Sequence, residues 1–155
     1  MSDMIDINII IDEECVEPVV DIRTYKQTQQ VDSIVSAIEN ASRSIYPPIP
    51  VTDGGKLSFV SQRDVYRIKT AGRKVSLETD SGTYVVRGTM NRFEEELDTE
   101  RFIRISQSEI VNLYKVKSFD LSGNGTILIE FENGEKSWVA RRCVKALREK
   151  LRNEV

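Results

Sequence analysis

Residues 101–113 alternate charged and polar side chains with branched apolar ones, and this run constrains the fold more than any other. A half-buried strand places successive side chains on opposite faces, so one face packs on a core while the other projects polar groups. The polar positions carry arginine, serine and glutamine. Arginine and glutamine make bidentate hydrogen bonds with base edges in a DNA major groove, and serine suits phosphates and bases alike. The pattern predicts a strand at residues 102–106 with a polar side suited to nucleic acid, then a turn region at 108–113.

Short strand patterns separated by turn residues fill most of the chain after residue 55. Thr89 is suited to cap a short helix that runs to Leu97, and residues 141–153 form a closing helical pattern. This half of the chain is therefore expected to be mainly β. The other predicted strands are residues 56–61, 65–70, 74–79, 83–87, 116–121, 126–131 and 136–139, with turns at Gly72, 80–82, 122–125 and 132–135.

The first fifty residues follow a different pattern. Residues 5–11 are a β-branched apolar run typical of a buried strand, and residues 16–22 predict a second strand, with Pro18 indicating a sheet edge. Apolar residues then recur at helical spacing from Thr28, which predicts a helix of about fifteen residues.

A proline-rich segment at residues 45–50 stops that helix and predicts a domain boundary. We therefore expect a small ββα-like N-terminal segment at residues 1–50 and a second domain at 51–155. The fold class is α+β and mostly β.

Charge is distributed unevenly along the chain, whose formal net charge is −3. Residues 1–55 carry three Lys/Arg against ten Asp/Glu, a net charge of −7, whereas residues 56–155 carry nineteen against fifteen, a net charge of +4. Such asymmetry suggests two differently charged units, of which the basic one faces a polyanion.

Composition excludes several classes of function. The chain has no histidine, which rules out Ser-His-Asp and Cys-His catalysis and histidine-based metal sites. Cys15 and Cys143 are too few for a zinc site or a disulfide framework, and no glycine-rich phosphate loop occurs. The acidic cluster at residues 94–96 is expected to be a solvated helix face. With an acidic start and no long apolar run, we expect a cytoplasmic protein that is not an enzyme and that uses no metal, cofactor or small-molecule substrate.

Two arginines, Arg141 and Arg142, open the last predicted helix. Cations at a helix start oppose the macrodipole, and local rules are usually broken where function demands it. Arg142 points away from the apolar stripe, toward solvent or a ligand; the alternative is a terminal helix whose cations are merely solvated. The cationic stripe is Arg141, Lys145, Arg148 and Arg152, and the apolar stripe is Val144, Leu147 and Leu151.

The order and spacing of these segments resemble the LytTR family of bacterial DNA-binding domains. The resemblance spans roughly residues 56–152. It implies an elongated, multi-sheet β fold with short helices, whose loops enter successive major grooves on one DNA face and bend the duplex between them. The matching residues are 59–65, 72–75, 86–88, 101–113, 119–121, 133–135 and the pair Arg141 and Arg142.

The resemblance implies three places of DNA contact. The family's polar pair corresponds to Ser106 and Gln107, where some members carry His-Asn or His-Arg, so the DNA sequence preferred by this chain stays open. Gln107 is suited to adenine, and the alternative is a turn whose serine and glutamine satisfy local backbone groups. The family's base-contacting arginine near the last helix corresponds to Arg142, with Arg141 as its neighbour.

A third loop, which the family inserts into a groove, corresponds to Arg73 and Lys74; the alternative is a plain surface hairpin. Arg104 either contacts DNA or pairs with a carboxylate on a neighbouring strand. Asn112 is expected to tie a loop, and Trp138 to fill the core. The candidate DNA-contacting residues are Arg73, Lys74, Arg104, Ser106, Gln107, Ser108, Arg141, Arg142 and Lys145.

We therefore expect a sequence-specific transcriptional regulator that binds promoter repeats in double-stranded DNA. The N-terminal segment is too short for the phosphorylated receiver domain that many family members carry, so we expect it to mediate homodimerisation or to receive a partner. A membrane-protein inhibitor is a further partner that the resemblance implies. The alternative function is a protein-interaction adaptor that keeps the fold without DNA binding, which the low pI favours. Single-strand or RNA binding is a third alternative, and it normally requires several exposed aromatic residues on a sheet. Few aromatic residues of this chain occupy such positions, so we discount it.

Overall fold

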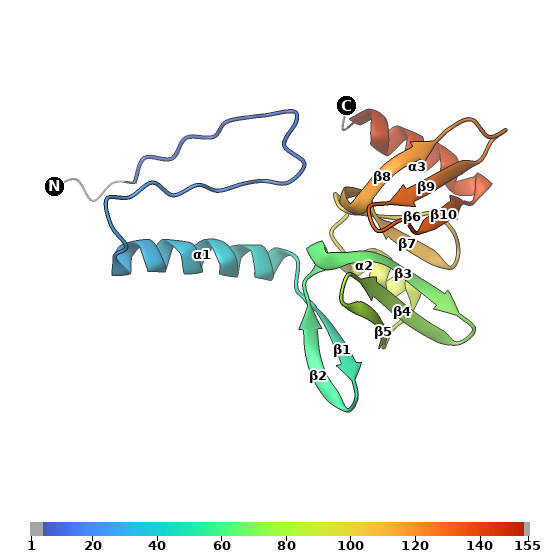
Figure 1. Ribbon diagram of the computed structural model, residues 1–155, viewed down its shortest axis with the longest axis horizontal. Coiled ribbons are helices and arrows are strands. Elements are labelled where there is room, and N and C mark those ends of the chain that lie inside the picture. The colour runs from blue at the N-terminus through green and yellow to red at the C-terminus, as the bar shows by residue number, and fades with distance from the viewer. Residues whose placement is uncertain (1–4, 154–155) are drawn as a thin grey trace.

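Antiparallel pairing organises the chain from Ile49 onward into two sheets (Figure 1). The computed structural model describes residues 5–153. Strand order is β2-β1-β5-β4-β3-β7-β6 in the seven-stranded sheet and β10-β9-β8 in the other. The elements are α1 (Gln29–Ile45), β1 (Ile49–Asp53), β2 (Lys56–Val60), η1 (Gln62–Asp64), β3 (Val65–Ala71), β4 (Lys74–Thr79), β5 (Gly82–Val86), α2 (Met90–Glu96), β6 (Phe102–Arg104), β7 (Glu109–Asn112), η2 (Leu113–Lys115), β8 (Val116–Asp120), β9 (Ile127–Phe131), β10 (Lys136–Val139) and α3 (Arg141–Asn153).

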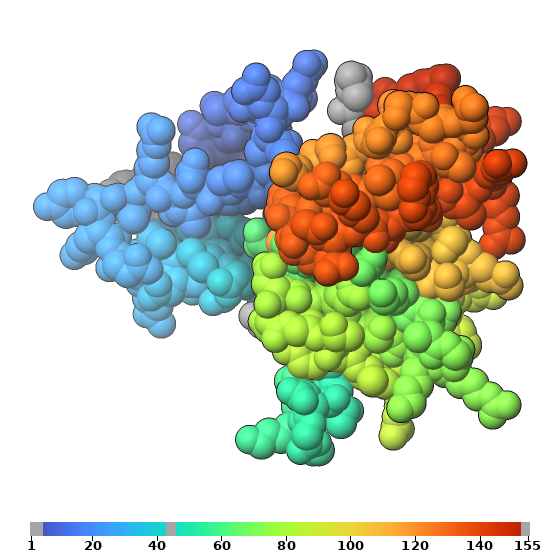
Figure 2. Space-filling model, turned by 45° about the vertical axis from the view of Figure 1, so that its right-hand side comes forward, coloured from blue at the N-terminus to red at the C-terminus, as the bar shows by residue number. Residues whose placement is uncertain are grey.

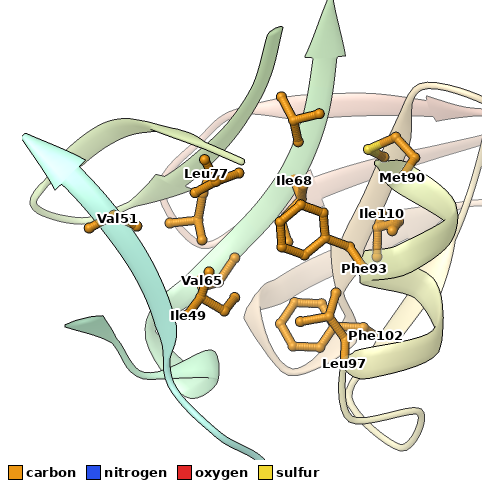
Figure 3. Close-up of a cluster of buried hydrophobic side chains, with 12 residues drawn as sticks. Ile49, Val51, Val65, Ile68, Leu77, Met90, Phe93, Leu97, Phe102 and Ile110 are labelled. Atoms are coloured by element: carbon orange, nitrogen blue, oxygen red, sulfur yellow. The ribbon is translucent and has the colours of Figure 1, made fainter. Parts of the chain in front are cut away.

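The first hydrophobic core lies between the seven-stranded sheet and α2 (Figure 3). Thr89 caps α2 as the sequence predicts, because its hydroxyl accepts a hydrogen bond from the Arg92 amide at 3.2 Å. Burial of Met90 and Phe93 then fixes this short helix against the strands. The core consists of Ile49, Val51, Val65, Ile68, Val75, Leu77, Val86, Met90, Phe93, Leu97, Phe102 and Ile110.

A second core lies between the two sheets and α3. Strand β3 serves both cores, since Ile68 belongs to the first and Tyr66 to the second. Tyr66 packs edge-on against Phe131 of β9, with ring centroids 6.1 Å apart. Burial, with the hydrogen bond and charge of Asp80, raises the pKa of Tyr66 to about 12, so its phenol stays neutral at physiological pH. The second core consists of Tyr66, Ile105, Val111, Leu113, Ile127, Ile129, Phe131, Val139 and Leu147.

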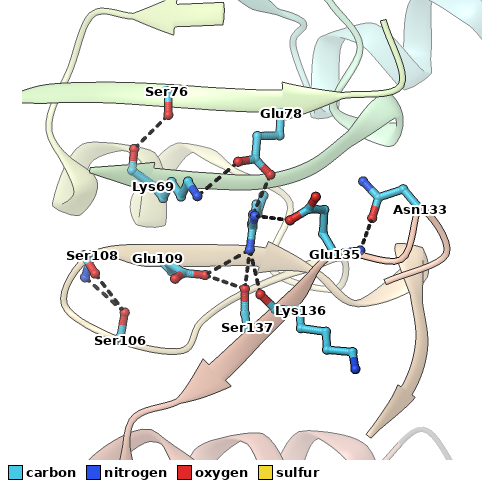
Figure 4. Close-up of polar contacts among 11 residues, drawn as sticks. Lys69, Ser76, Glu78, Ser106, Ser108, Glu109, Asn133, Glu135, Lys136 and Ser137 are labelled. Atoms are coloured by element: carbon cyan, nitrogen blue, oxygen red, sulfur yellow. Dashed lines mark hydrogen bonds and ion pairs between the residues drawn. The ribbon is translucent and has the colours of Figure 1, made fainter. Parts of the chain in front are cut away.

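The guanidinium of Arg67 joins the two sheets, and Figure 4 labels the partners that surround it, Glu78, Glu109, Glu135 and Ser137. Its Nη1 donates to Ser137 Oγ on β10 at 2.7 Å, its Nε donates to Glu78 on β4, and its Nη2 donates to Glu135 at 3.4 Å. Ser137 in turn donates to Glu109 on β7 at 2.7 Å. Arg67 is only 5% exposed. A buried cation whose hydrogen-bond partners all come from the protein therefore sets the position of one sheet relative to the other.

The β pattern predicted from sequence is confirmed over most of the chain. Strands β4 and β10 and helix α3 have the predicted bounds, and the other predicted strands after residue 55 differ from the observed ones by two residues or fewer at each end. Asn112 ties a loop as predicted: its side-chain amide donates to the Val65 carbonyl at 2.8 Å, and its Oδ1 accepts from the Tyr114 amide at 3.0 Å.

Three predictions in this region are wrong. The expected turn at 108–113 is largely strand β7, because its backbone pairs with β3 and β6. The expected connector at 45–50 includes the start of β1, which pairs with β2. Trp138, expected in the core, is 63% exposed, since Ser137 and Val139 on either side of it point inward and successive strand residues alternate.

The N-terminal segment is an extended arm followed by α1, so the two strands predicted at 5–11 and 16–22 are absent from the single chain. A β-prone run becomes a strand only when another strand supplies backbone partners, and none lies beside it here. Helix α1 confirms the predicted helix, and Thr28 caps it by accepting a hydrogen bond from Val31 N. Of the helices in residues 5–153, none has both the length and the apolar character needed to cross a bilayer.

Candidate nucleic-acid interface

Three segments at one end of the molecule carry all the candidate DNA-contacting residues except Arg104, which ends β6, and we name these segments the contact tips. They are the turn between β3 and β4 (residues 71–74), the loop between β6 and β7 (residues 106–108) and the start of α3 (residues 141–145). All three lie away from α1 in Figure 1, and Figure 2 brings that end toward the viewer. The fold thus gathers segments that are up to seventy residues apart in the sequence.

Two backbone hydrogen bonds fix the spacing of the contact tips. The Thr70 amide, at the end of β3, donates to the Ser108 carbonyl at 2.9 Å. The Ala140 amide, just before α3, donates to the Ile105 carbonyl at 2.8 Å. Since Ile105 is fully buried in the second core, the loop at 106–108 is anchored from below and holds the other two tips beside it.

The first contact tip is a tight hairpin turn. Ala71 pairs with Lys74, so Gly72 and Arg73 form a two-residue loop. Gly72 has a φ of +66°, which the first central position of a type II′ turn requires and which glycine adopts without strain. The side chains of Arg73 and Lys74 are exposed at this turn. Two cations thus stand on a rigid two-strand support.

Arg104 organises the second contact tip from within. Its Nε donates to the Ser106 carbonyl at 3.1 Å, and its Nη2 donates to the Gln107 carbonyl at 2.7 Å. Its Nη1 donates to Glu94 at 2.8 Å and to Asn91 at 2.6 Å, both on α2. The guanidinium therefore clamps the loop to α2. The predicted carboxylate partner is present, although it lies on a helix rather than on a strand.

Side chains of the loop itself divide between local bonding and exposure. Ser106 Oγ accepts a hydrogen bond from the Ser108 amide at 3.2 Å and lies 3.3 Å from Ser108 Oγ. This is the local bonding that the alternative interpretation of the serines expects. The Gln107 side chain is exposed. Of the three, Gln107 is the one best placed to reach a base edge.

The third contact tip is the start of α3. Cys143, Val144 and Leu151 pack against the second core, and Leu147 is fully buried in it. This packing turns Arg141, Arg142 and Lys145 outward, and all three are exposed. No acidic residue occupies the first turn of the helix. The cationic and apolar stripes of the sequence therefore separate in the structure as predicted.

The three contact tips together carry five cations and no carboxylate. The acidic cluster of α2 contributes Glu94 to the Arg104 clamp, while Glu96 pairs with Arg92 on its own helix at 2.9 Å. The acidic N-terminal arm lies at the other end of the molecule in Figure 1. Each tip carries at least one exposed side chain able to donate hydrogen bonds to phosphates or base edges.

Comparison with known proteins points to one family. The family model of the LytTr DNA-binding domain matches residues 55–152, more than half of the chain. The sensory transduction protein LytT of Enterococcus faecalis is 31% identical over 103 residues, which cover 66% of this chain and 43% of LytT. The chain therefore spans less than half of that relative's length.

A second relative matches almost end to end. An uncharacterized HTH-type transcriptional regulator of Staphylococcus aureus is 26% identical over 148 residues, which cover 96% of this chain and 99% of that protein. A solved LytTr DNA-binding domain, from a putative methyl-accepting/DNA response regulator of Bacillus cereus, has the same fold, with a TM-score of 0.64 and 22% identity over 67% of this chain and 95% of that one. The chain belongs to the LytTR family of DNA-binding domains found in transcriptional regulators.

Proposed function

We propose that this chain is a sequence-specific, double-stranded DNA-binding transcriptional regulator whose contact tips enter successive major grooves on one face of the duplex. Lysines and arginines would position the domain on phosphates, and a few bidentate contacts would read bases. The pair of backbone hydrogen bonds that holds the three tips at one end carries this proposal. Specific recognition requires the side chains that read bases to lie at fixed separations, and these two hydrogen bonds support such fixed separations.

The direct test is selection of bound duplexes from a random pool, followed by binding titrations at several salt concentrations. We expect a repeated motif to emerge and its affinity to fall steeply as salt rises, because bound phosphates release counterions. An adaptor that had lost DNA binding would give no enriched motif and no salt-dependent retardation, and that result would refute the proposal.

Lysines at the tips should act through phosphate charge. We expect Lys74→Ala and Lys145→Ala each to weaken binding to selected and random duplexes alike, and to reduce the slope of log K against log salt by about one. Both side chains are exposed and neither forms an ion pair among the described residues. Lys117→Ala, which removes an exposed lysine paired with Glu130 at 3.8 Å, serves as the control and should leave the slope unchanged.

Arg104 should act through the loop rather than through its own charge. We expect Arg104→Met to lower affinity for the selected site about tenfold or more, with a nearly unchanged salt slope, because the guanidinium is bound to two loop carbonyls and to α2. Discrimination between base pairs at the position that Gln107 is proposed to read should fall together with the affinity. A loss of one unit in salt slope without loss of base preference would show instead that Arg104 contacts phosphate.

A further inference from the structure

The N-terminal arm, residues 5–28, exposes an unusual amount of apolar surface. Ile7, Ile9 and Ile11 are 79%, 83% and 91% exposed. Val35 and Ile38 on α1 are also exposed. Contiguous exposed apolar side chains mark an interaction surface, since a soluble chain gains free energy by covering them.

A second uncovered surface lies at the edge of the seven-stranded sheet. Strand β2 is the terminal strand, so one side of its backbone has no neighbouring strand. Leu57 and Phe59 on β2 are 66% and 64% exposed, and Val85, two strands further in, is exposed as well. An edge strand with apolar side chains is a template for another strand.

The arm and β2 match residue by residue. Residues 6–10 of the arm and Lys56–Val60 of β2 share the pattern polar, apolar, polar, apolar, apolar. Running the two strands parallel puts a carboxylate beside an ammonium group, whereas the antiparallel direction puts both charges beside apolar residues. The parallel register pairs Asp6 with Lys56, Ile7 with Leu57, Asn8 with Ser58, Ile9 with Phe59 and Ile10 with Val60.

We propose that residues 6–10 of a second copy of this chain add a parallel strand to the free edge of β2, reciprocally, in a twofold homodimer. One surface patch on each copy then serves both, as a twofold interface requires. Main-chain hydrogen bonds to β2 supply the backbone partners that the predicted N-terminal strand lacks within the single chain. The inference concerns the arm and β2, neither of which belongs to the contact tips, so it stands apart from DNA binding.

The anchoring of the arm favours pairing of residues 6–10 with β2 of a second copy rather than with β2 of the same chain. Glu17 accepts a hydrogen bond from Arg101 at 2.7 Å and another from Arg63 at 3.0 Å. Partial burial raises the pKa of Glu17, but the Arg101 hydrogen bond and the two arginine charges outweigh it and hold that pKa below its ordinary value. From this anchor residues 5–11 run back over α1, which lies between them and the β1–β2 hairpin (Figures 1 and 2).

Disulfide trapping tests the register and the partner together. In a background with Cys15→Ser and Cys143→Ala, two differently tagged copies of the full chain are co-expressed, one with Asp6→Cys and the other with Lys56→Cys. Adjacent strands lie close enough for a disulfide. Random pairing puts the two differently tagged copies together in about half of the twofold dimers, and we expect oxidation to link the two tags in most of those mixed dimers. Ile10→Cys with Lys56→Cys, which reports the antiparallel register, is the matched control and should give a small fraction of that product.

Oligomeric state supplies an independent measurement. Light scattering of the unmodified chain should give twice the chain mass of 17.7 kDa, and Ile7→Asp with Ile9→Asp should halve the measured mass. The double variant should keep its fold and its affinity for a single DNA half-site, because neither isoleucine belongs to either core.

A monomer in solution would overturn the proposal. So would disulfide links between two Asp6→Cys arms, or efficient trapping by the antiparallel pair. A chain that carries both Asp6→Cys and Lys56→Cys gives a fourth contrary result if it forms links only within itself. Each of these leaves DNA binding intact. Failure of the proposed function is a separate outcome, in which the dimer forms but retards no duplex.

Discussion

Arg67→Met is expected to lower the free energy of unfolding by about 3–5 kcal/mol, since removing one partner of a buried ion pair leaves uncompensated charge. Glu78 lies against this guanidinium and is itself largely buried, and Glu109 lies 3.9 Å from it. Without Arg67, Glu78 keeps only its pair with Lys69 at 3.3 Å, Glu109 loses its cation, and Ser137 loses the donor that connects β10 to β3. Urea denaturation followed by circular dichroism measures the change.

The matched control is Lys117→Met, which breaks the exposed pair with Glu130 and should change stability by less than about 1 kcal/mol. The triple replacement of Arg67, Glu78 and Glu109 by Met, Gln and Gln should recover part of the loss, because no carboxylate is then left unpaired beside the missing cation. An Arg67→Met protein as stable as the Lys117→Met protein would show that the sheets are held by apolar packing alone.

Arg142→Ala is expected to weaken binding to the selected DNA site by about 1–3 kcal/mol, or roughly 5- to 150-fold, while affinity for random duplexes falls much less. The reason is positional: Arg142 stands exposed at the start of α3, beside the loop at 106–108, and a bidentate contact to guanine discriminates between bases. Gln107→Ala should show the same asymmetry with adenine as the affected base. Fluorescence anisotropy on matched and base-substituted duplexes measures both.

Arg92→Ala provides a control for the loss of an arginine. Arg92 is exposed on α2, is bound to Glu96 and belongs to none of the three tips, so its removal should change neither affinity nor base preference. Equal losses on selected and random DNA for Arg142→Ala would mean that Arg142 touches only phosphate. Base reading would then rest on the other two tips.

Much of the fold follows from short-range pattern. Apolar alternation between turn residues predicts β4 and β10 with the observed bounds, because a strand half-buried on a core needs one apolar face and the turn residues allow reversal. Thr28 and Thr89 mark two helix starts, since a hydroxyl there satisfies an amide that the helix leaves free. Gln107 and Arg142 are exposed, in keeping with their places in the pattern, and their contact with DNA stays a prediction.

Other features depend on which elements meet. Nothing local distinguishes Arg67 from the exposed cations around it; its burial follows from β3 lying between two cores. Trp138 is the largest apolar side chain of β10, yet the face of the strand on which it lies is exposed to solvent. Arg104 became a clamp because α2 folds back beside the loop.

The amino-acid sequence by itself therefore determined most of the strands after residue 55, the helix caps, the separation of cationic and apolar stripes on α3 and the family. Tertiary structure alone decided which cations are buried, which loops lie together and which apolar runs lack a partner strand. The physical reason is the separation along the chain over which each interaction acts. Backbone conformation and side-chain alternation are set by neighbours a few residues apart, whereas burial and charge pairing depend on residues brought together from distant parts of the chain.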